Sequence, residues 1–366
     1  MSIFGFKILS RLIQSTIGDL DREHTHITLS YNAEAGQIFK ISMEVYAGHN
    51  GGDEILSDNY VVLIPEENIT EFPEDVNQKT IKNGSFGAIR EEVFQLWMDI
   101  RTLYDLRHNL DNNSLRKAMV DKGLTDVCDA VNIETEIDEF LRDVIKGREI
   151  LKPLLECKNG STVPVMYAIG NSHLDFEWKW TIGETRRKVA RTIGNQLKLM
   201  EEYEDYKYIQ SQPWTLDILK DEYPELYKDF KRAVKDGRII VEGGMWVESD
   251  TNLPSGESLI RQFLFGKRFI KDEFGIESEM LWLPDIFGVS GAMPQIMKEC
   301  GIKYFMNAKL PWIYNDGDPF PCGSFVWQGI DGSEILSYMT EDYAAKINPS
   351  NIFEKWNKEA DKKMHL

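Results

Sequence analysis

The sequence predicts an α/β protein with a (β/α) barrel-like domain of mainly parallel strands, preceded by a small β-rich segment and a helical region. Three observations predict this fold class. Short apolar runs rich in β-branched and aromatic residues occur over residues 26–63. Apolar residues then recur at intervals of three and four over residues 88–156. From residue 165 onward, strand-like and helix-like patterns alternate.

The first two regions have different hydrophobic patterns, strand-like in the first and helical in the second. Residues 1–87 hold the strand-like runs "HITLSYN", "IFKISMEVYAG" and "YVVLIPEE", with Gly, Asn and Pro between them. Residues 88–160 hold helical stretches such as "REEVFQLWMDIRTLYDLRHNL" and lead into the linker-like "ECKNGSTVP". We therefore expect a partial β-rich segment over 1–87, a helical region with its linker over 88–160, and the barrel-like domain over 161–366.

The third region predicts seven strands. In chain order they are "VMYAI", "YKYIQ", "RIIVEG", "EMLWL", "KYFMN", "SFVWQ" and "EILSYM". Helical patterns lie between the first five, over residues 184–203, about 215–236, 255–274 and 292–300. This alternation predicts βα units, and in such folds ligands bind beyond the carboxyl ends of the strands.

The composition and net charge of the chain limit the kinds of molecule that it is expected to bind. The net charge of −18 and the pI near 4.9 argue against nucleic acid and against an anionic membrane surface, but they allow neutral sugars. No apolar run is long enough for a membrane span, and the apolar start lacks the features of a signal peptide. The cysteines form no CxxC pair, which favours a reducing compartment and a cytoplasmic location. They are Cys128, Cys157, Cys300 and Cys322.

Polar residues follow several of the predicted strands. His173 and Asp175 lie two apart in "GNSHLDFEWKW", after the first strand. Glu248 and Asp250 follow the third strand, and Asp285 follows the fourth. Imidazole and carboxylates are ordinary ligands for zinc or a similar divalent ion, and paired carboxylates serve glycoside hydrolysis. The residues alone predict a metal-assisted hydrolase of a neutral polar substrate.

Each of these residues also has a structural interpretation. Asp175 could cap a turn, and His173 could be a hydrogen-bonded polar core residue. Glu248 and Asp250 could be solvated loop acids. The tryptophans near these positions, among them Trp178, could be core residues, or their flat faces could stack on a sugar ring.

Four stretches resemble the α-mannosidases of glycoside hydrolase family 38, in particular the cytosolic and bacterial branch. They are "GNSHLDFEW", "GGMWVESDTNLPSGESLIRQFLFG", "WLPDIFGVSGAMPQIMKECGI" and "FVWQGIDGSEIL". The resemblance is good over about residues 165–340 and weaker over 26–160. It implies a zinc-dependent retaining hydrolase of terminal α-D-mannosides, acting on a mannose-containing oligosaccharide or a simpler mannoside.

The resemblance also assigns residues. It implies that His173, Asp175 and Asp285 ligate Zn²⁺ or a similar divalent metal, and that Asp285 is in addition the catalytic nucleophile. Trp178 and Asp250 match substrate-binding positions of the family.

Some features depart from the family pattern. Glu177 stands where a small alanine is common, and Val289 replaces a tyrosine. A fourth zinc ligand and an acid/base aspartate are expected further downstream than this sequence extends. We therefore expect a truncated α-mannosidase, incomplete at its C-terminus, whose 366-residue chain alone is weakly active or inactive.

Alternatives remain open at this point. Within the family, a mannosylglycerate-type hydrolase fits the same motifs. Outside it stand a non-catalytic sugar-binding remnant and a zinc-dependent deacetylase on a similar barrel. A homo-oligomer is also left open, whereas neither nucleic acid nor a membrane is expected as a partner.

Overall fold

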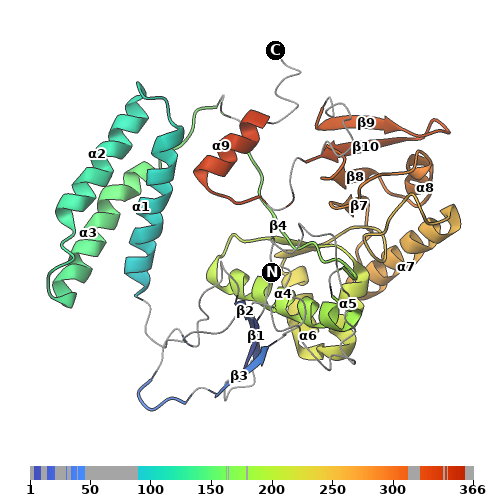
Figure 1. Cartoon of the computed structure of the whole chain (residues 1–366), viewed down its shortest axis with the longest axis horizontal. Helices are drawn as coiled ribbons and strands as arrows, with labels where there is room; N and C mark the ends of the chain where they lie inside the picture. The colour runs from blue at the N-terminus through green and yellow to red at the C-terminus, as the bar shows by residue number, and fades with distance from the viewer. Residues whose placement is uncertain are drawn as a thin grey trace, which may run out of the picture. The chain divides into compact units, whose positions relative to one another are not determined.

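The structure is a computed structural model of the 366-residue chain. It describes residues 4–9, 15–20, 30, 34–38, 40–45, 90–161, 163, 165–178, 180–311, 322–340, 343 and 345–358. The chain forms two compact units (Figure 1). Unit 1 comprises Met1–Lys79 with Ile169–Tyr343, and unit 2 comprises Thr80–Ala168 with Ala344–Leu366. The predicted domain division at residues 87 and 160 stays a prediction.

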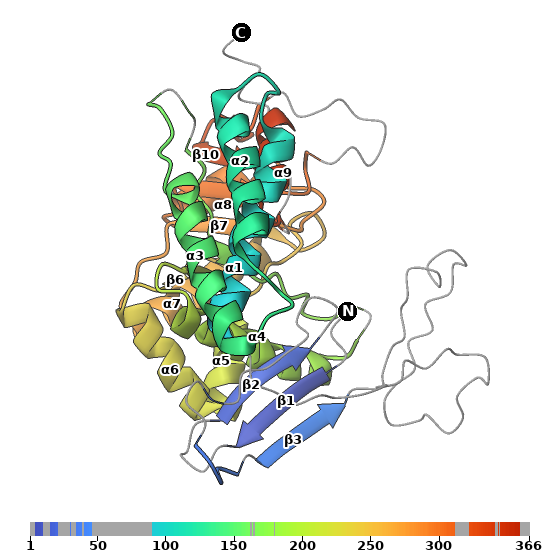
Figure 2. The same cartoon turned by 90° about the vertical axis from the view of Figure 1, so that its left-hand side faces the viewer.

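Unit 2 is helical, and Figure 2 shows its first three helices side by side. They are α1 (Glu91–Asn109), α2 (Leu115–Ala130) and α3 (Ile137–Leu155), followed far along the chain by α9 (Pro349–Lys358). Apolar residues three, four and seven apart form the shared core, which confirms the helices expected over residues 88–156. The fully buried members are Leu96, Leu103, Val120, Val127, Val144 and Leu151.

Unit 1 contains a mainly parallel sheet. Strands β4, β5 and β6 pair in parallel, and β7, β8 and β10 do the same, with β9 antiparallel at the edge beside β10. A parallel bridge between Gly243 and Leu281 links the two groups. The strands are β4 (Gly170–Asn171), β5 (Tyr208–Gln210), β6 (Ile239–Val241), β7 (Met280–Leu283), β8 (Tyr304–Asn307), β9 (Ser324–Gln328) and β10 (Glu334–Met339). The predicted α/β fold class is confirmed.

Five helices alternate with these strands. They are α4 (Ile182–Glu202), α5 (Pro213–Glu222), α6 (Pro224–Lys235), α7 (Gly256–Phe274) and α8 (Met293–Glu299). The single helix expected over about 215–236 is in fact two, because Pro224 lacks an N–H and its ring excludes the preceding residue from helical geometry. Pro224 instead begins α6, where a missing N–H costs nothing.

The expected strand "VMYAI" is displaced. Residues 165–169 form no strand, and Tyr167 is 93% exposed. Only the next two residues, Gly170 and Asn171, pair with β5. The chain turns at Tyr203–Tyr206 just before β5 begins, so β5 offers no partner to the residues ahead of Gly170.

The N-terminal part of unit 1 holds a three-stranded antiparallel sheet of order β2-β1-β3. Its strands are β1 (Phe4–Leu9), β2 (Ser15–Leu20) and β3 (Lys40–Val45). The run "IFKISMEVYAG" contains β3, as expected. β1 and β2 were not expected as strands. The other two expected runs lie outside the described residues, apart from Ser30, which is not in a strand.

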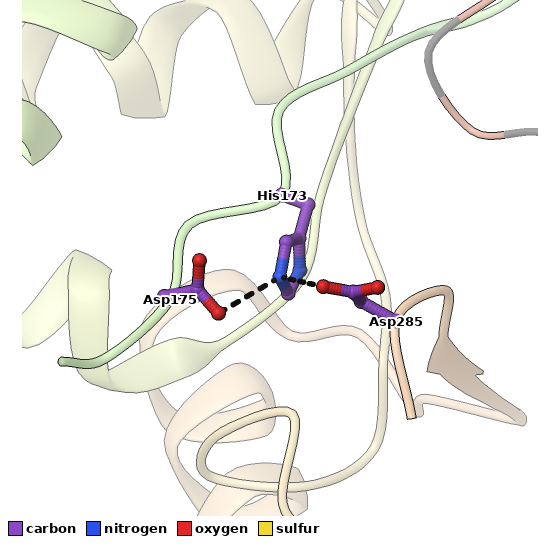
Figure 3. Close-up of side chains that lie close together, drawn as sticks. All are labelled: His173, Asp175 and Asp285. Carbon is purple, nitrogen blue, oxygen red and sulfur yellow. Dashed lines mark ion pairs between the residues drawn. The ribbon is translucent and has the colours of Figure 1, made fainter. Parts of the chain in front are cut away.

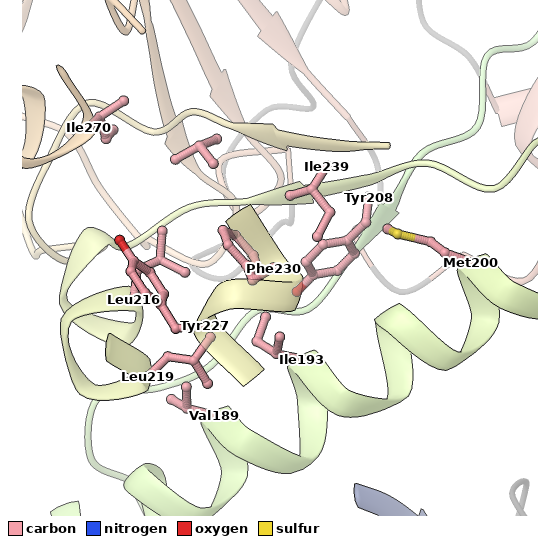
Figure 4. Close-up of a cluster of buried hydrophobic side chains, with 11 residues drawn as sticks. Val189, Ile193, Met200, Tyr208, Leu216, Leu219, Tyr227, Phe230, Ile239 and Ile270 are labelled. Carbon is pink, nitrogen blue, oxygen red and sulfur yellow. The ribbon is translucent and has the colours of Figure 1, made fainter. Parts of the chain in front are cut away.

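Two buried clusters hold the parallel sheet in place. The first joins β5 and β6 to α4, α5 and α6, with Tyr208 and Phe230 fully buried at its centre (Figure 4). The second packs β7, β8 and β10 against α7 and α8, through residues such as Phe263 and Phe305. Helices packed on a parallel sheet are the arrangement that βα alternation predicts.

The backbone of the loop after β6 packs directly against the backbone of α7. Gly243 and Gly244 have φ values of +133° and +74°, which glycine adopts without strain. A Cβ built on Gly266 of α7 would lie about 2.5 Å from the carbonyl carbon of Met245. Trp246 also donates its N–H to the Gln262 carbonyl on α7, at 2.9 Å. Gly266 thus lets α7 support the loop that leads to Glu248.

We predict that Gly266→Ala lowers the free energy of unfolding by about 1–3 kcal/mol, because the added methyl group must displace backbone rather than a flexible side chain. Chemical denaturation at neutral pH measures the change. Gly256→Ala is the matched control on the same helix, since nothing lies within 4 Å of its added Cβ. Equal stability of the two variants would contradict the prediction.

A second stability prediction concerns Glu273 on α7. Its carboxylate accepts hydrogen bonds from Lys220 at 2.7 Å, Tyr227 at 2.8 Å and Lys231 at 3.2 Å, which joins α7 to α5 and α6. Burial alone would raise the pKa of Glu273, but these three donors outweigh it and lower the pKa from 4.5 to about 2. Because the folded-state pKa is the lower one, the stabilisation is present above pH 4.5 and is lost as the pH falls toward 2.

Glu273→Gln should therefore reduce the free energy of unfolding at pH 7 by roughly 1–2 kcal/mol, a value that allows for the exposure of the two lysines. The difference from wild type should shrink as the pH falls from 4.5 toward 2. Urea unfolding across this range measures it. Asp272→Asn, which removes an exposed ion pair with Arg268, serves as control. A difference that stays constant with pH would count against the assignment.

Candidate active site

Three of the predicted site residues lie together at one place in unit 1. The ligand atoms of His173, Asp175 and Asp285 all lie within 4.8 Å of one another (Figure 3). His173 Nε2 is 3.4 Å from Asp175 Oδ1 and 3.2 Å from Asp285 Oδ2. His173 and Asp175 follow β4, and Asp285 follows β7. The carboxyl ends of the strands have therefore brought together residues 110 positions apart in sequence, as the rule for parallel sheets predicts.

The imidazole of His173 is held from its other side by Glu248. His173 Nδ1 lies 2.5 Å from Glu248 Oε2, and the Ser211 hydroxyl donates to Glu248 Oε1. The Glu248 side chain is only 4% exposed. Of the two interpretations open for Glu248 from the sequence, the solvated loop acid is therefore wrong. Its burial was not evident from sequence, because it depends on segments that fold over it from elsewhere in the chain.

These carboxylates control the charge of His173. Burial would lower the pKa of the imidazole, since it disfavours the charged form. Hydrogen bonds and charge from Asp175 and Glu248 act in the opposite direction and together raise the pKa from 6.5 to about 9. Without a bound metal, His173 is therefore a cation at neutral pH.

Asp285 has a second partner, Lys309, which was not among the residues predicted from the sequence. Lys309 Nζ lies 2.7 Å from Asp285 Oδ1, and both side chains are largely buried. The ammonium also lies 5.2 Å from the Phe287 ring centroid and 5.8 Å from that of Tyr343. Lys309 comes two residues after β8, so the strand-end rule could have found it. The pair leaves Asp285 Oδ2 directed toward His173.

The two predicted substrate-binding residues are not part of this cluster. Trp178 is 59% exposed, and its ring meets Trp180 edge-on at 5.6 Å. Asp250 is exposed, and its Oδ1 accepts the backbone N–H groups of Asn252 and Leu253, each at 2.8 Å. Trp178 is thus largely exposed, while Asp250 shapes a turn. A substrate role for either residue stays a prediction.

The residues that depart from the family pattern are accommodated. Glu177 is exposed, so its charge remains hydrated. Val289 packs against the buried cluster of β7, β8 and β10.

All four cysteines are free thiols. Within the described part of the chain, no helix is both long and apolar enough to cross a membrane.

The donor set fits a divalent metal. His173 Nε2 is buried and faces two carboxylates, but within the described part of the chain neither of them forms a hydrogen bond of regular geometry with it. Ligands at 2.0–2.2 Å in tetrahedral geometry are about 3.3 Å from one another. The distances of 3.2 and 3.4 Å from His173 Nε2 to the two carboxylates match that spacing.

The known proteins that this chain resembles include alpha-mannosidases. The model of the glycosyl hydrolases family 38 N-terminal domain matches residues 164–365. The chain is 34% identical to alpha-mannosidase G of Dictyostelium discoideum over 328 residues, covering 89% of this chain and 28% of that protein. It is 44% identical over 175 residues to an alpha-mannosidase of Saccharomyces cerevisiae, covering 48% of this chain and 16% of that protein.

Among solved structures, an alpha-mannosidase from Enterococcus faecalis aligns with 52% of this chain and 22% of its own, with 20% identity and a TM-score of 0.43. The chain spans less than a third of the length of either of the two curated relatives above. The family match nevertheless covers more than half of the chain and includes His173, Asp175 and Asp285. The chain therefore belongs to glycosyl hydrolase family 38.

Proposed function

We propose that this chain is part of a zinc-dependent, retaining α-mannosidase that hydrolyses terminal α-D-mannosides, with Asp285 as nucleophile. The observation that carries the proposal is that His173, Asp175 and Asp285 lie close enough together to bind one metal ion, in a chain of this family. The substrate would be a mannose-containing oligosaccharide or a simpler mannoside. A cytoplasmic location is part of the proposal, supported by the four free thiols.

His173, Asp175 and Asp285 are the residues that would hold the metal. When bound, zinc would supply a Lewis-acid contact for hydroxyl groups of the sugar. Asp285 would then serve both as ligand and as nucleophile. Its two oxygens have separate neighbours, since Oδ1 pairs with Lys309 and Oδ2 faces His173. Lys309 thus fixes the rotation of the carboxylate and balances part of the negative charge of the cluster.

The chemistry proposed for Asp285 is a double displacement. One carboxylate oxygen forms a bond to the anomeric carbon while the bond from that carbon to the aglycone oxygen breaks, and the departing oxygen takes up a proton from a general acid. Water then adds to the anomeric carbon, the conjugate base of that acid takes a proton from the water, the bond to Asp285 breaks, and mannose leaves with its configuration retained. Trp178 would stack on a sugar ring, and Asp250 would accept a hydrogen bond from a sugar hydroxyl with its Oδ2.

The raised pKa of His173 predicts how zinc affinity varies with pH. A metal ligand must be neutral imidazole, so zinc must displace a proton at any pH below about 9. The apparent association constant should rise about tenfold per pH unit from pH 7 to 9 and then level off. Competition with a chelator of known zinc affinity measures this. His108→Asn, which changes an exposed histidine of α1, should keep the same slope, whereas a flat profile in wild type would contradict the role of His173.

The role of Asp285 as nucleophile can be tested with a substrate whose cleavage needs no general acid. A fluorinated mannosyl fluoride has a leaving group that needs no proton, so covalent labelling depends on the nucleophile rather than on the acid. The zinc-loaded chain should gain the mass of one fluoromannosyl group on the peptide that contains Asp285. Asp285→Asn should abolish labelling, and the exposed control Asp272→Asn should retain it. Labelling at another residue, or none in wild type, would refute the proposed nucleophile.

A further inference from the structure

Gln212 occupies an unusual backbone position beside the cluster. Its φ of +58° is the only positive value at a non-glycine residue in the described part of the chain. Left-handed backbone at such a residue is unfavourable and persists only where the surroundings impose it. The residue is 3% exposed. Its conformation therefore points to a requirement for its side chain at this place.

The side chain of Gln212 joins two segments of the site. Its Nε2 donates to the carbonyl of Leu174 at 2.8 Å, and its Oε1 accepts the backbone N–H of Glu248 at 3.3 Å. Leu174 is the residue between His173 and Asp175. Gln212 thus holds the backbone between two proposed ligands at a set distance from the segment that carries Glu248.

Glu248 completes the connection through its side chain. The carboxylate joins His173 Nδ1 to the Ser211 hydroxyl, and Ser211 directly precedes Gln212. When Nδ1 keeps its hydrogen and donates it in a hydrogen bond to Glu248, the lone pair of a neutral imidazole lies on Nε2. That atom is the one facing Asp175 and Asp285.

We infer that Glu248 and Gln212 are positioning residues for the proposed metal site, with Glu248 orienting the His173 ring and Gln212 holding the backbone between His173 and Asp175. This inference rests on the proposed function. Neither residue is a ligand; both act through the residues that are. A carboxylate behind a ligating histidine fixes the ring and the nitrogen that carries the proton, and losing one weakens metal binding about 10–100-fold.

The test compares Glu248→Leu with Glu248→Gln in the full chain. The leucine variant removes the acceptor and should weaken zinc binding about 10–100-fold in chelator competition. The glutamine variant keeps an oxygen that can accept from Nδ1, so it should restore most of that loss. Gln212→Leu should weaken zinc binding in the same direction, because it releases the Leu174 carbonyl.

Glu242 supplies the matched control. It also follows β6, and its carboxylate accepts from the Ser278 hydroxyl and from the backbone N–H groups of Glu279 and Met280. Glu242→Gln should alter stability and leave zinc affinity at the wild-type value. An equal loss of affinity in Glu242→Gln and Glu248→Leu would show a general structural effect and overturn the inference, as would wild-type affinity in Glu248→Leu.

A second readout needs no metal. The chain has six histidines, so labelling their ring nitrogens with ¹⁵N gives few signals, and His173→Asn identifies the one from His173. The Nδ1–H proton of His173 should resonate downfield in wild type and in Glu248→Gln, and should be lost to exchange in Glu248→Leu. The same proton signal in all three proteins would overturn the role of Glu248. If wild type binds no zinc, the proposed function fails, while this signal still decides whether Glu248 orients the ring.

Discussion

The site depends on the balance of charge around one buried imidazole. Three carboxylates, from Asp175, Glu248 and Asp285, surround His173, and two of them come from strand ends far apart in the sequence. Buried like charges are costly unless cations accompany them. The imidazolium of His173 and the ammonium of Lys309 are those cations. A divalent metal on the same ligands would serve the same electrostatic need.

The scaffold meets this need by bringing strand ends together. Parallel pairing from β4 to β6, the bridge at Gly243, and pairing from β7 to β8 place the carboxyl ends on one side. The loop that carries Glu248 is held on α7 through the close approach at Gly266. The backbone strain at Gln212 is tolerated because the nitrogen and the oxygen of its side-chain amide are both hydrogen-bonded. Local strain and close packing thus serve the placement of a few polar atoms.

Sequence patterns were most reliable where they depend on local physics. The helices of unit 2 follow from the spacing of apolar residues, and the order of strands and helices after residue 165 follows from their alternation. Two local sequence signals differ from the structure. Pro224 divides a helix that looked continuous, and "VMYAI" is as apolar as a buried strand but lacks a pairing partner. Apolar composition shows that a segment can form a strand, whereas pairing requires a neighbouring strand of matching extent.

The sequence by itself determined the α/β class, the alternation of strands and helices after residue 170, and His173, Asp175 and Asp285 as residues following strands. These properties depend on short-range periodicity and on motifs continuous in the chain. Only the tertiary structure decided that Glu248 is buried behind His173, that Lys309 pairs with Asp285, and that Gln212 links the two segments. Burial and side-chain contacts between residues 24 to 75 positions apart depend on how strands pair and helices pack, and no local pattern shows which residues will meet.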